Sequence, residues 1–236
     1  MMKFALLDAF AAVFANTKYE HRRSTTGDVV ASYLFEDLLK LQLSPKFAER
    51  VATGRVVVNA MNQAIGKDAR RGDGTLGESV PGASRAAVAG YSVERGKIAA
   101  VEIGVETKIL AKAMNKQIDR VITALKAQIA DFRQSNPSVI TVALIGVNHA
   151  PSYLSFEGNR EFPTDGKKMK HPIQEAEKAI ARLEQEARAA FDEFLFLRFS
   201  AANVPPYLFE WVDLSRTRDE YAAALTRIAK AYERRF

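Results

Sequence analysis

The sequence predicts an α/β layered domain in which α-helices flank a mixed central β-sheet. Amphipathic helical patterns open and close the chain, and an apolar pattern over residues 85–110 predicts a β-hairpin. A continuous β-branched run over residues 138–150 predicts a strand that is covered on both faces. Because 236 residues can bury one large core, we assign residues 1–236 to a single domain.

The first part of the chain predicts helices followed by a loop. Apolar residues recur at helical spacing over residues 3–15 and again over 24–42, where a run of capping residues precedes them. Residues 44–53 predict a further short helix, whereas residues 54–63 are too few to assign. Residues 66–84 are rich in glycine and charge, so they predict a long loop.

The middle of the chain predicts the hairpin and the elements that follow it. Residues 94–97, with the sequence ERGK, form the expected turn between its two strands. A strongly periodic helix is expected over residues 112–134, ending before Pro137, and the buried strand over 138–150 follows.

The last third of the chain predicts a loop, a helix, a strand region and a final helix. The loop covers residues 151–171, and a long charged helix with a proline near its start covers 172–194. Residues 194–212 predict one strand or two, divided by a pair of prolines. The closing helix is expected over residues 215–236.

Composition restricts the function classes. The chain carries 34 basic and 28 acidic side chains, and its net charge of +6 suits a polyanionic partner such as nucleic acid. It has no cysteine, which excludes disulfides, a cysteine nucleophile and thiolate-bound zinc or iron–sulfur centres. No apolar run is long enough to span a bilayer, so we expect a cytoplasmic protein without a membrane partner.

Charged residues interrupt the second strand of the predicted hairpin, within the sequence IAAVEIGVETKIL. Strict alternation would place Glu102, Gly104, Glu106 and Lys108 on one face, with the glycine leaving open space between the two carboxylates. Neighbouring carboxylates stay ionised most easily when a cation lies between them, and Mg²⁺ prefers oxygen ligands. An ordinary half-exposed edge strand would show a similar alternation, so the pattern also fits a strand that carries no functional site.

A hairpin that ends in Glu-x-Lys, followed by a helix with Gln117 and then an aliphatic strand, resembles the PD-(D/E)xK nuclease superfamily, the fold of most type II restriction endonucleases. The resemblance covers roughly residues 66–150, the expected catalytic core, with residues 1–65 as an N-terminal helical part. It implies a restriction-endonuclease-like sheet, Mg²⁺ bound by Glu106, and a Lys108 that positions or activates water. It further implies double-stranded DNA as substrate and a homodimer.

The chain departs from this family at its first acidic residue. The family places that acid on the first strand of the hairpin, where this sequence has no carboxylate. The substitutes are Asp73 and Glu78, in the sequence RRGDGTLGE, and Glu102 on the strand itself. We expect Asp73 or Glu78 to complete the metal site, without a choice between them, and Glu102 to support it. An ordinary glycine-rich connector would explain the same segment.

Two groups of basic residues are candidates for DNA binding. They lie in the loops that the sequence predicts before and after the core: Arg70, Arg71, Lys167, Lys168 and Lys170. Such side chains suit a phosphate backbone, although charged loops are often merely solvated.

The combined expectation is a Mg²⁺-dependent type II restriction endonuclease that belongs to a restriction-modification system. The missing first-strand acid favours one alternative, a non-catalytic nucleic-acid-binding or assembly protein on an eroded nuclease fold. A small-molecule-binding α/β protein is a third possibility, but the sequence has no recognisable phosphate or cofactor loop.

Overall fold

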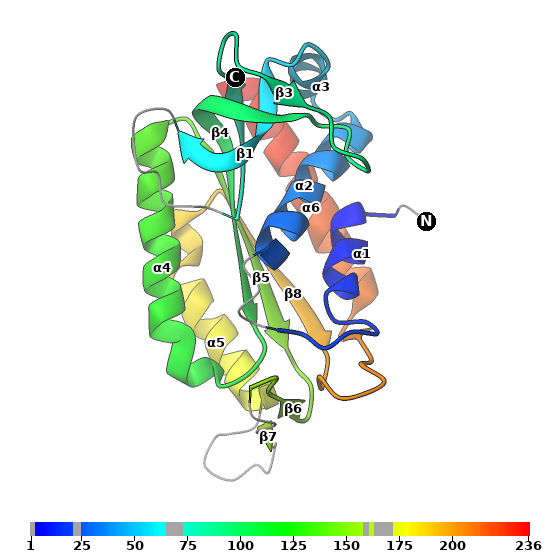
Figure 1. Cartoon of the computed structure of the whole chain (residues 1–236). Coiled ribbons are helices and arrows are strands. Elements are labelled where there is room, and N and C mark those ends of the chain that lie inside the picture. The colour runs from blue at the N-terminus through cyan, green and yellow to red at the C-terminus, as the bar shows by residue number, and fades with distance from the viewer. Residues whose placement is uncertain (1–2, 21–24, 65–72, 158–160, 163–171) are drawn as a thin grey trace.

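The computed structural model of the chain describes residues 3–20, 25–64, 73–157, 161–162 and 172–236. A mixed seven-stranded sheet forms its centre, with helices on both faces (Figure 1). The strands of this sheet are β1 Val56–Ala64, β2 Gly74–Ser79, β3 Arg85–Ala86, β4 Arg95–Leu110, β5 Ile140–Asn148, β8 Glu193–Ser200 and β9 Glu210–Trp211. A separate two-stranded sheet pairs β6 Tyr153–Leu154 with β7 Glu161–Phe162.

Strand order explains the mixed character of the sheet. The order is β1-β2-β4-β5-β8-β9, with β3 paired to β4 beside this path and β1 also paired to β4. The pairs β1–β2, β2–β4, β3–β4 and β8–β9 are antiparallel, whereas β4–β5 and β5–β8 are parallel. The β1–β4 pair is also parallel. The connections from β4 to β5 and from β5 to β8 each carry a helix, as direct crossovers between parallel strands require.

Six α-helices lie in the described part of the chain and cover the sheet. They are α1 Ala5–Ala12, α2 Thr25–Leu41, α3 Pro45–Ala52, α4 Met114–Ser135, α5 Pro172–Glu186 and α6 Leu214–Arg235. Figure 1 shows α4 and α5 on one face, with α1, α2 and α6 on the other. A short 3₁₀ turn, Arg188–Ala190, follows α5.

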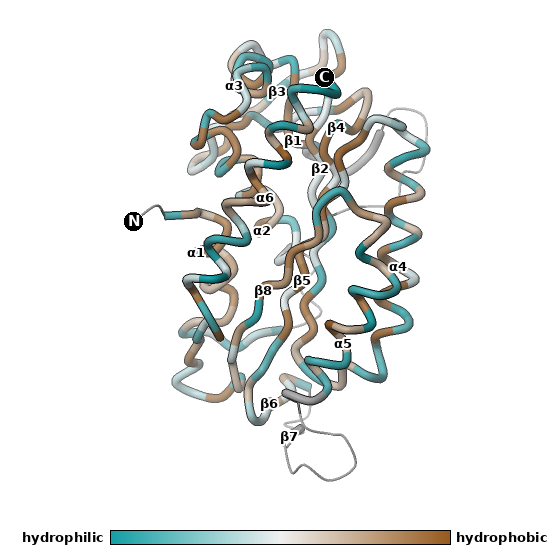
Figure 2. Tube along the Cα trace, turned by 180° about the vertical axis from the view of Figure 1, so that it is seen from behind, coloured by the Kyte–Doolittle hydropathy of each residue, from teal (hydrophilic) through white to brown (hydrophobic). Residues whose placement is uncertain are grey.

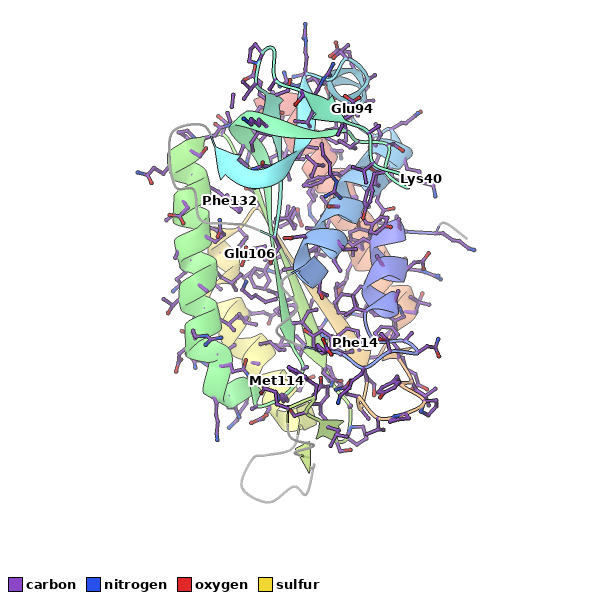
Figure 3. All side chains as sticks on the ribbon, in the orientation of Figure 1. Phe14, Lys40, Glu94, Glu106, Met114 and Phe132 are labelled. Carbon is purple, nitrogen blue, oxygen red and sulfur yellow. The ribbon has the colours of Figure 1, made fainter. Side chains whose placement is uncertain are left out.

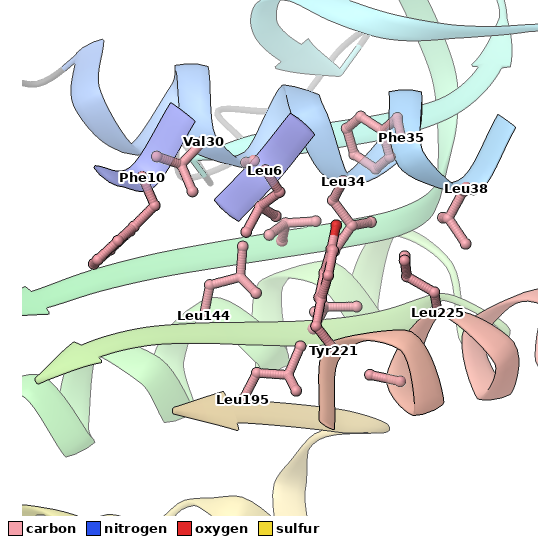
Figure 4. Close-up of a cluster of buried hydrophobic side chains, with 14 of the residues drawn as sticks. Leu6, Phe10, Val30, Leu34, Phe35, Leu38, Leu144, Leu195, Tyr221 and Leu225 are labelled. Carbon is pink, nitrogen blue, oxygen red and sulfur yellow. The ribbon is translucent and has the colours of Figure 1, made fainter. Parts of the chain in front are cut away.

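The sheet buries apolar side chains on both faces. Between the strands and α1, α2 and α6, the core contains Leu34, Leu144 and Tyr221 (Figure 4). On the other face, α4 and α5 pack Leu125 and Leu183 against β5 and β8. Figure 2 shows hydrophobic colour along β5, as expected of a strand covered on both faces. The predicted buried strand is therefore confirmed, and so is the α/β class.

The helical predictions are confirmed at all six α-helices, with ends that shift by a few residues. The charged helix expected over residues 172–194 is shorter, because α5 ends at Glu186 and β8 begins at Glu193. The strand region around the two prolines contains two strands, β8 and β9.

The predicted hairpin is wrong in its first strand. Only the two residues of β3 pair with β4 in the segment expected as its first strand, and the long antiparallel partner of β4 is β2. The turn expected over residues 94–97 is wrong as well, because β4 already begins at Arg95. β2 lies inside residues 66–84, which we predicted to be a loop because they are rich in glycine and charge. That prediction is wrong over β2. The unassigned segment before it forms β1, so the part of the chain over 1–65 is not wholly helical.

Across the described part of the chain, no helix combines the length and the apolar character needed to cross a membrane.

Candidate functional site

Asp73 lies directly before β2 and next to the Glu-x-Lys segment of β4. The antiparallel pairing sets Gly74 opposite Val105, so the chain enters β2 at the level of Glu106. The backbone N–H of Thr107 donates a 2.8 Å hydrogen bond to Asp73 Oδ2. This bond ties the Asp73 carboxylate to the strand that carries both Glu106 and Lys108.

One ammonium group connects the two carboxylates. Lys108 Nζ contacts Glu106 Oε1 and lies 3.9 Å from Asp73 Oδ2. Glu106 and Lys108 are two residues apart on a strand and therefore point to the same face, toward α4. Figure 3 shows Glu106 near the middle of the sheet, between α4 and α2. Asp73, Glu106 and Lys108 thus converge; we call them the acid–lysine cluster.

Glu106 is the buried member of the acid–lysine cluster. The residue is 5% exposed, and burial together with the nearby Asp73 carboxylate raises the pKa of Glu106 to about 7, against the opposing charge of Lys108 and hydrogen bonds from Lys108 and the Asp73 backbone. Among the described residues, no group donates a hydrogen bond to the buried Glu106 Oε2. A buried carboxylate oxygen without a donor is costly, and a bound cation would compensate it.

The donor set fits Mg²⁺. Mg²⁺ is usually held by one or two carboxylates and completes its shell with waters and substrate phosphate oxygens. Asp73 and Glu106 supply two carboxylates that both lie near Lys108 Nζ, and Glu106 Oε2 is buried without a hydrogen-bond donor among the described residues. Within the described residues, no cluster of three or more His, Cys, Asp or Glu side chains has metal-binding geometry, so water and substrate would have to complete the shell.

The acid–lysine cluster borders a cleft of about 830 Å³, and the buried Glu106 is not among the residues that line this cleft. Asp73 and Lys108 line the cleft, while the first turn of α2 and the first turns of α4 form its walls. Gly27 of α2 lies against Asp73: a Cβ atom on Gly27 would stand 2.6 Å from the Asp73 carboxylate carbon. Glycine at this position leaves the room that the carboxylate occupies.

Glu102 points away from the acid–lysine cluster. The β2–β4 register advances from Leu76–Ile103 to Gly77–Val101, so Glu102 is the extra residue of a β-bulge. The bulge breaks the alternation and sends Glu102 to the opposite face, where its carboxylate accepts hydrogen bonds from Arg50 and Tyr232. The expectation that Glu102 shares a face with Glu106 and supports its metal is therefore wrong.

The space beside Gly104 is filled. A Cβ atom on Gly104 would lie 2.6 Å from ring carbons of Phe132 in α4. The expected open space between two carboxylates is thus occupied by an aromatic ring, and the glycine lets α4 approach β4 closely.

Glu78 does not join the acid–lysine cluster either. It lies within β2 opposite Ala100, six residues along β4 from Glu106, and its side chain is exposed. Its charge acts on Glu102 instead, whose pKa is raised mainly by burial. Of the two upstream acids that the sequence left open, the structure brings Asp73 to Glu106 and keeps Glu78 away.

The basic residues expected to bind DNA lie outside the described residues: Arg70, Arg71, Lys167, Lys168 and Lys170. The cleft has other cations that we did not expect, namely Lys112 just before α4 and Lys116 and Arg120 in its first turns. Their regular spacing of four residues, directly after Glu-x-Lys, could have identified them in the sequence as candidates for binding the substrate.

No protein-family model matches the chain, and no curated protein or solved structure matches it. The function is therefore argued from the geometry of the acid–lysine cluster.

Proposed function

We propose that the protein is a Mg²⁺-dependent endonuclease that hydrolyses phosphodiester bonds of double-stranded DNA. One observation carries this proposal: the residue before β2, Asp73, meets the Glu-x-Lys segment of β4, and Asp73 and Lys108 both line a cleft beside the buried Glu106. Two carboxylates and a lysine supply the charges needed to bind a divalent cation and a phosphodiester together.

The strand order supports a restriction-endonuclease-like core. An antiparallel strand pair presents the acids, α4 crosses over, and β5 returns parallel to β4. Asp73 also stands at the start of the strand paired with β4, where the resemblance requires its first acid. A type II restriction enzyme that acts as a cytoplasmic homodimer is the specific form that we propose.

Each residue of the acid–lysine cluster has a distinct role in this hydrolysis. Asp73 and Glu106 would hold Mg²⁺, which when bound polarises the phosphate and lowers the pKa of a coordinated water. Lys108 contributes positive charge where the water oxygen forms its bond to phosphorus and negative charge accumulates. The bond from phosphorus to one sugar oxygen breaks, leaving a phosphate monoester and a hydroxyl group.

Removal of Lys108 tests the proposal. Wild-type protein with Mg²⁺ or Mn²⁺ should convert plasmid and phage DNA into discrete fragments. The Lys108→Ala variant should cleave on the order of 10²- to 10³-fold more slowly, because a charge that stabilises the transition state is missing. The measurement is the initial rate of fragment formation on gels, with folding of both proteins checked by circular dichroism.

The alternative function is a non-catalytic nucleic-acid-binding or assembly protein on the same fold. The lack of a carboxylate on the strand before Glu-x-Lys favours this alternative, whereas the position of Asp73 directly before β2 and beside Thr107 supports the nuclease. DNA binding without cleavage by wild type and Lys108→Ala alike would establish this alternative and refute the nuclease.

A further inference from the structure

The first turns of α4 present a row of cations along one wall of the cleft. Lys116 and Arg120 lie in these turns, and Lys112 lies just before the helix, where it also donates a hydrogen bond to Ser155 Oγ. All three line the cleft at intervals of four residues in the sequence; we call them the α4 basic row. Within the helix, the four residues from Lys116 to Arg120 advance about 6 Å, and side chains at this spacing lie on one flank. The row begins four residues after Lys108, which lines the same cleft, so it leads away from the acid–lysine cluster.

Charge in the cleft is predominantly positive. Its described lining includes Lys108 and the α4 basic row, against the two acids Asp73 and Glu157. Lys116 and Arg120 are exposed, and neither forms an ion pair with another described residue. The acid beside Arg120 in the sequence, Asp119, instead pairs with Arg182 of α5 at 2.7 Å.

We propose that the α4 basic row binds successive phosphates of one nucleic-acid strand and guides that strand to the acid–lysine cluster. This inference rests on the proposed function and deepens it, because it assigns the surface that holds the substrate. A row of cations at regular steps matches a chain of regularly spaced anions better than it matches a single small anion. The α4 basic row ends beside Lys108. A nucleic-acid strand bound along the row would therefore bring its next phosphodiester to the acid–lysine cluster.

The α4 helix also provides a matched control. Lys126 is exposed on α4, but its charge acts on Glu186 of α5 and it does not line the cleft. Lys126→Ala therefore removes the same charge from the same helix without touching the α4 basic row. All three variants, Lys116→Ala, Arg120→Ala and Lys126→Ala, change exposed positions and should fold.

The test measures binding of a fluorescently labelled duplex oligonucleotide by anisotropy, without divalent ion, over a range of salt concentrations. Lys116→Ala and Arg120→Ala should each weaken DNA binding about three- to tenfold at low salt. Each should also reduce the slope of log affinity against log salt by about 1, because each loses one phosphate contact. Lys126→Ala should keep wild-type affinity and slope.

Equal binding by all three variants, or no DNA binding by wild type, would overturn the inference. The two proposals fail separately. If wild type cleaves DNA while the row variants bind like Lys126→Ala, the basic row is refuted and the nuclease stands. If the row variants lose affinity but wild type never cleaves, the row is supported and the nuclease is refuted.

Discussion

Asp73→Asn should reduce the rate of DNA cleavage on the order of 10³-fold while the protein remains folded. The side-chain oxygen of asparagine can still accept the hydrogen bond from the Thr107 N–H, so local structure should persist. The variant loses the negative charge that, with Glu106, would hold the divalent cation. The measurement is the initial cleavage rate in Mg²⁺ at saturating DNA.

Glu78→Gln is the matched control for this prediction. It also removes one carboxylate from β2, but Glu78 is exposed and lies opposite Ala100, away from Glu106. Its cleavage rate should stay near that of wild type. Loss of cleavage in Glu78→Gln with retention in Asp73→Asn would reverse our assignment of the upstream acid.

Arg50→Ala should lower the free energy of unfolding by about 3 to 5 kcal/mol. The Glu102 side chain is 3% exposed and pairs with Arg50, whose side chain is 17% exposed. Without Arg50, the Glu102 carboxylate keeps only the hydrogen bond from Tyr232 among its described partners, and an uncompensated charge remains buried. Urea unfolding followed by circular dichroism measures the loss.

Arg216→Ala provides the comparison for this stability effect. It breaks an ion pair with Glu220 on the exposed surface of α6, where solvent screens the charges, so stability should change little. Folded Arg50→Ala should keep wild-type cleavage per molecule, because Glu102 faces away from the acid–lysine cluster. A cleavage defect at wild-type stability would instead return Glu102 to the active site.

The helices and β5 could be predicted because their signals are local. Helical periodicity and a long β-branched run depend on neighbouring residues alone. β2 could not be predicted in this way, because the sequence GTLGES combines two glycines with polar residues and resembles a loop. It becomes a strand through long-range pairing with β1 and β4, which no local window contains.

Two of the three residues of the acid–lysine cluster could be placed together from the sequence. Glu106 and Lys108 are two residues apart on a regular stretch of strand, so alternation places them together correctly. The same rule fails at Glu102 because a bulge inserts one residue there. The sequence feature that accompanies this bulge is Gly77 on the partner strand, β2. A Cβ atom on Gly77 would stand 1.9 Å from the Ala100 carbonyl oxygen, so only glycine fits there.

The most direct test of the acid–lysine cluster as a divalent-metal site is Mn²⁺ binding followed by electron paramagnetic resonance, since it requires no knowledge of a DNA recognition sequence. Because the pKa of Glu106 is about 7 and a metal ligand must be deprotonated, wild-type affinity should rise about tenfold from pH 6 to pH 8. Asp73→Asn should lose this binding and Glu78→Gln should keep it. Equal Mn²⁺ binding by Asp73→Asn and wild type would contradict the assignment.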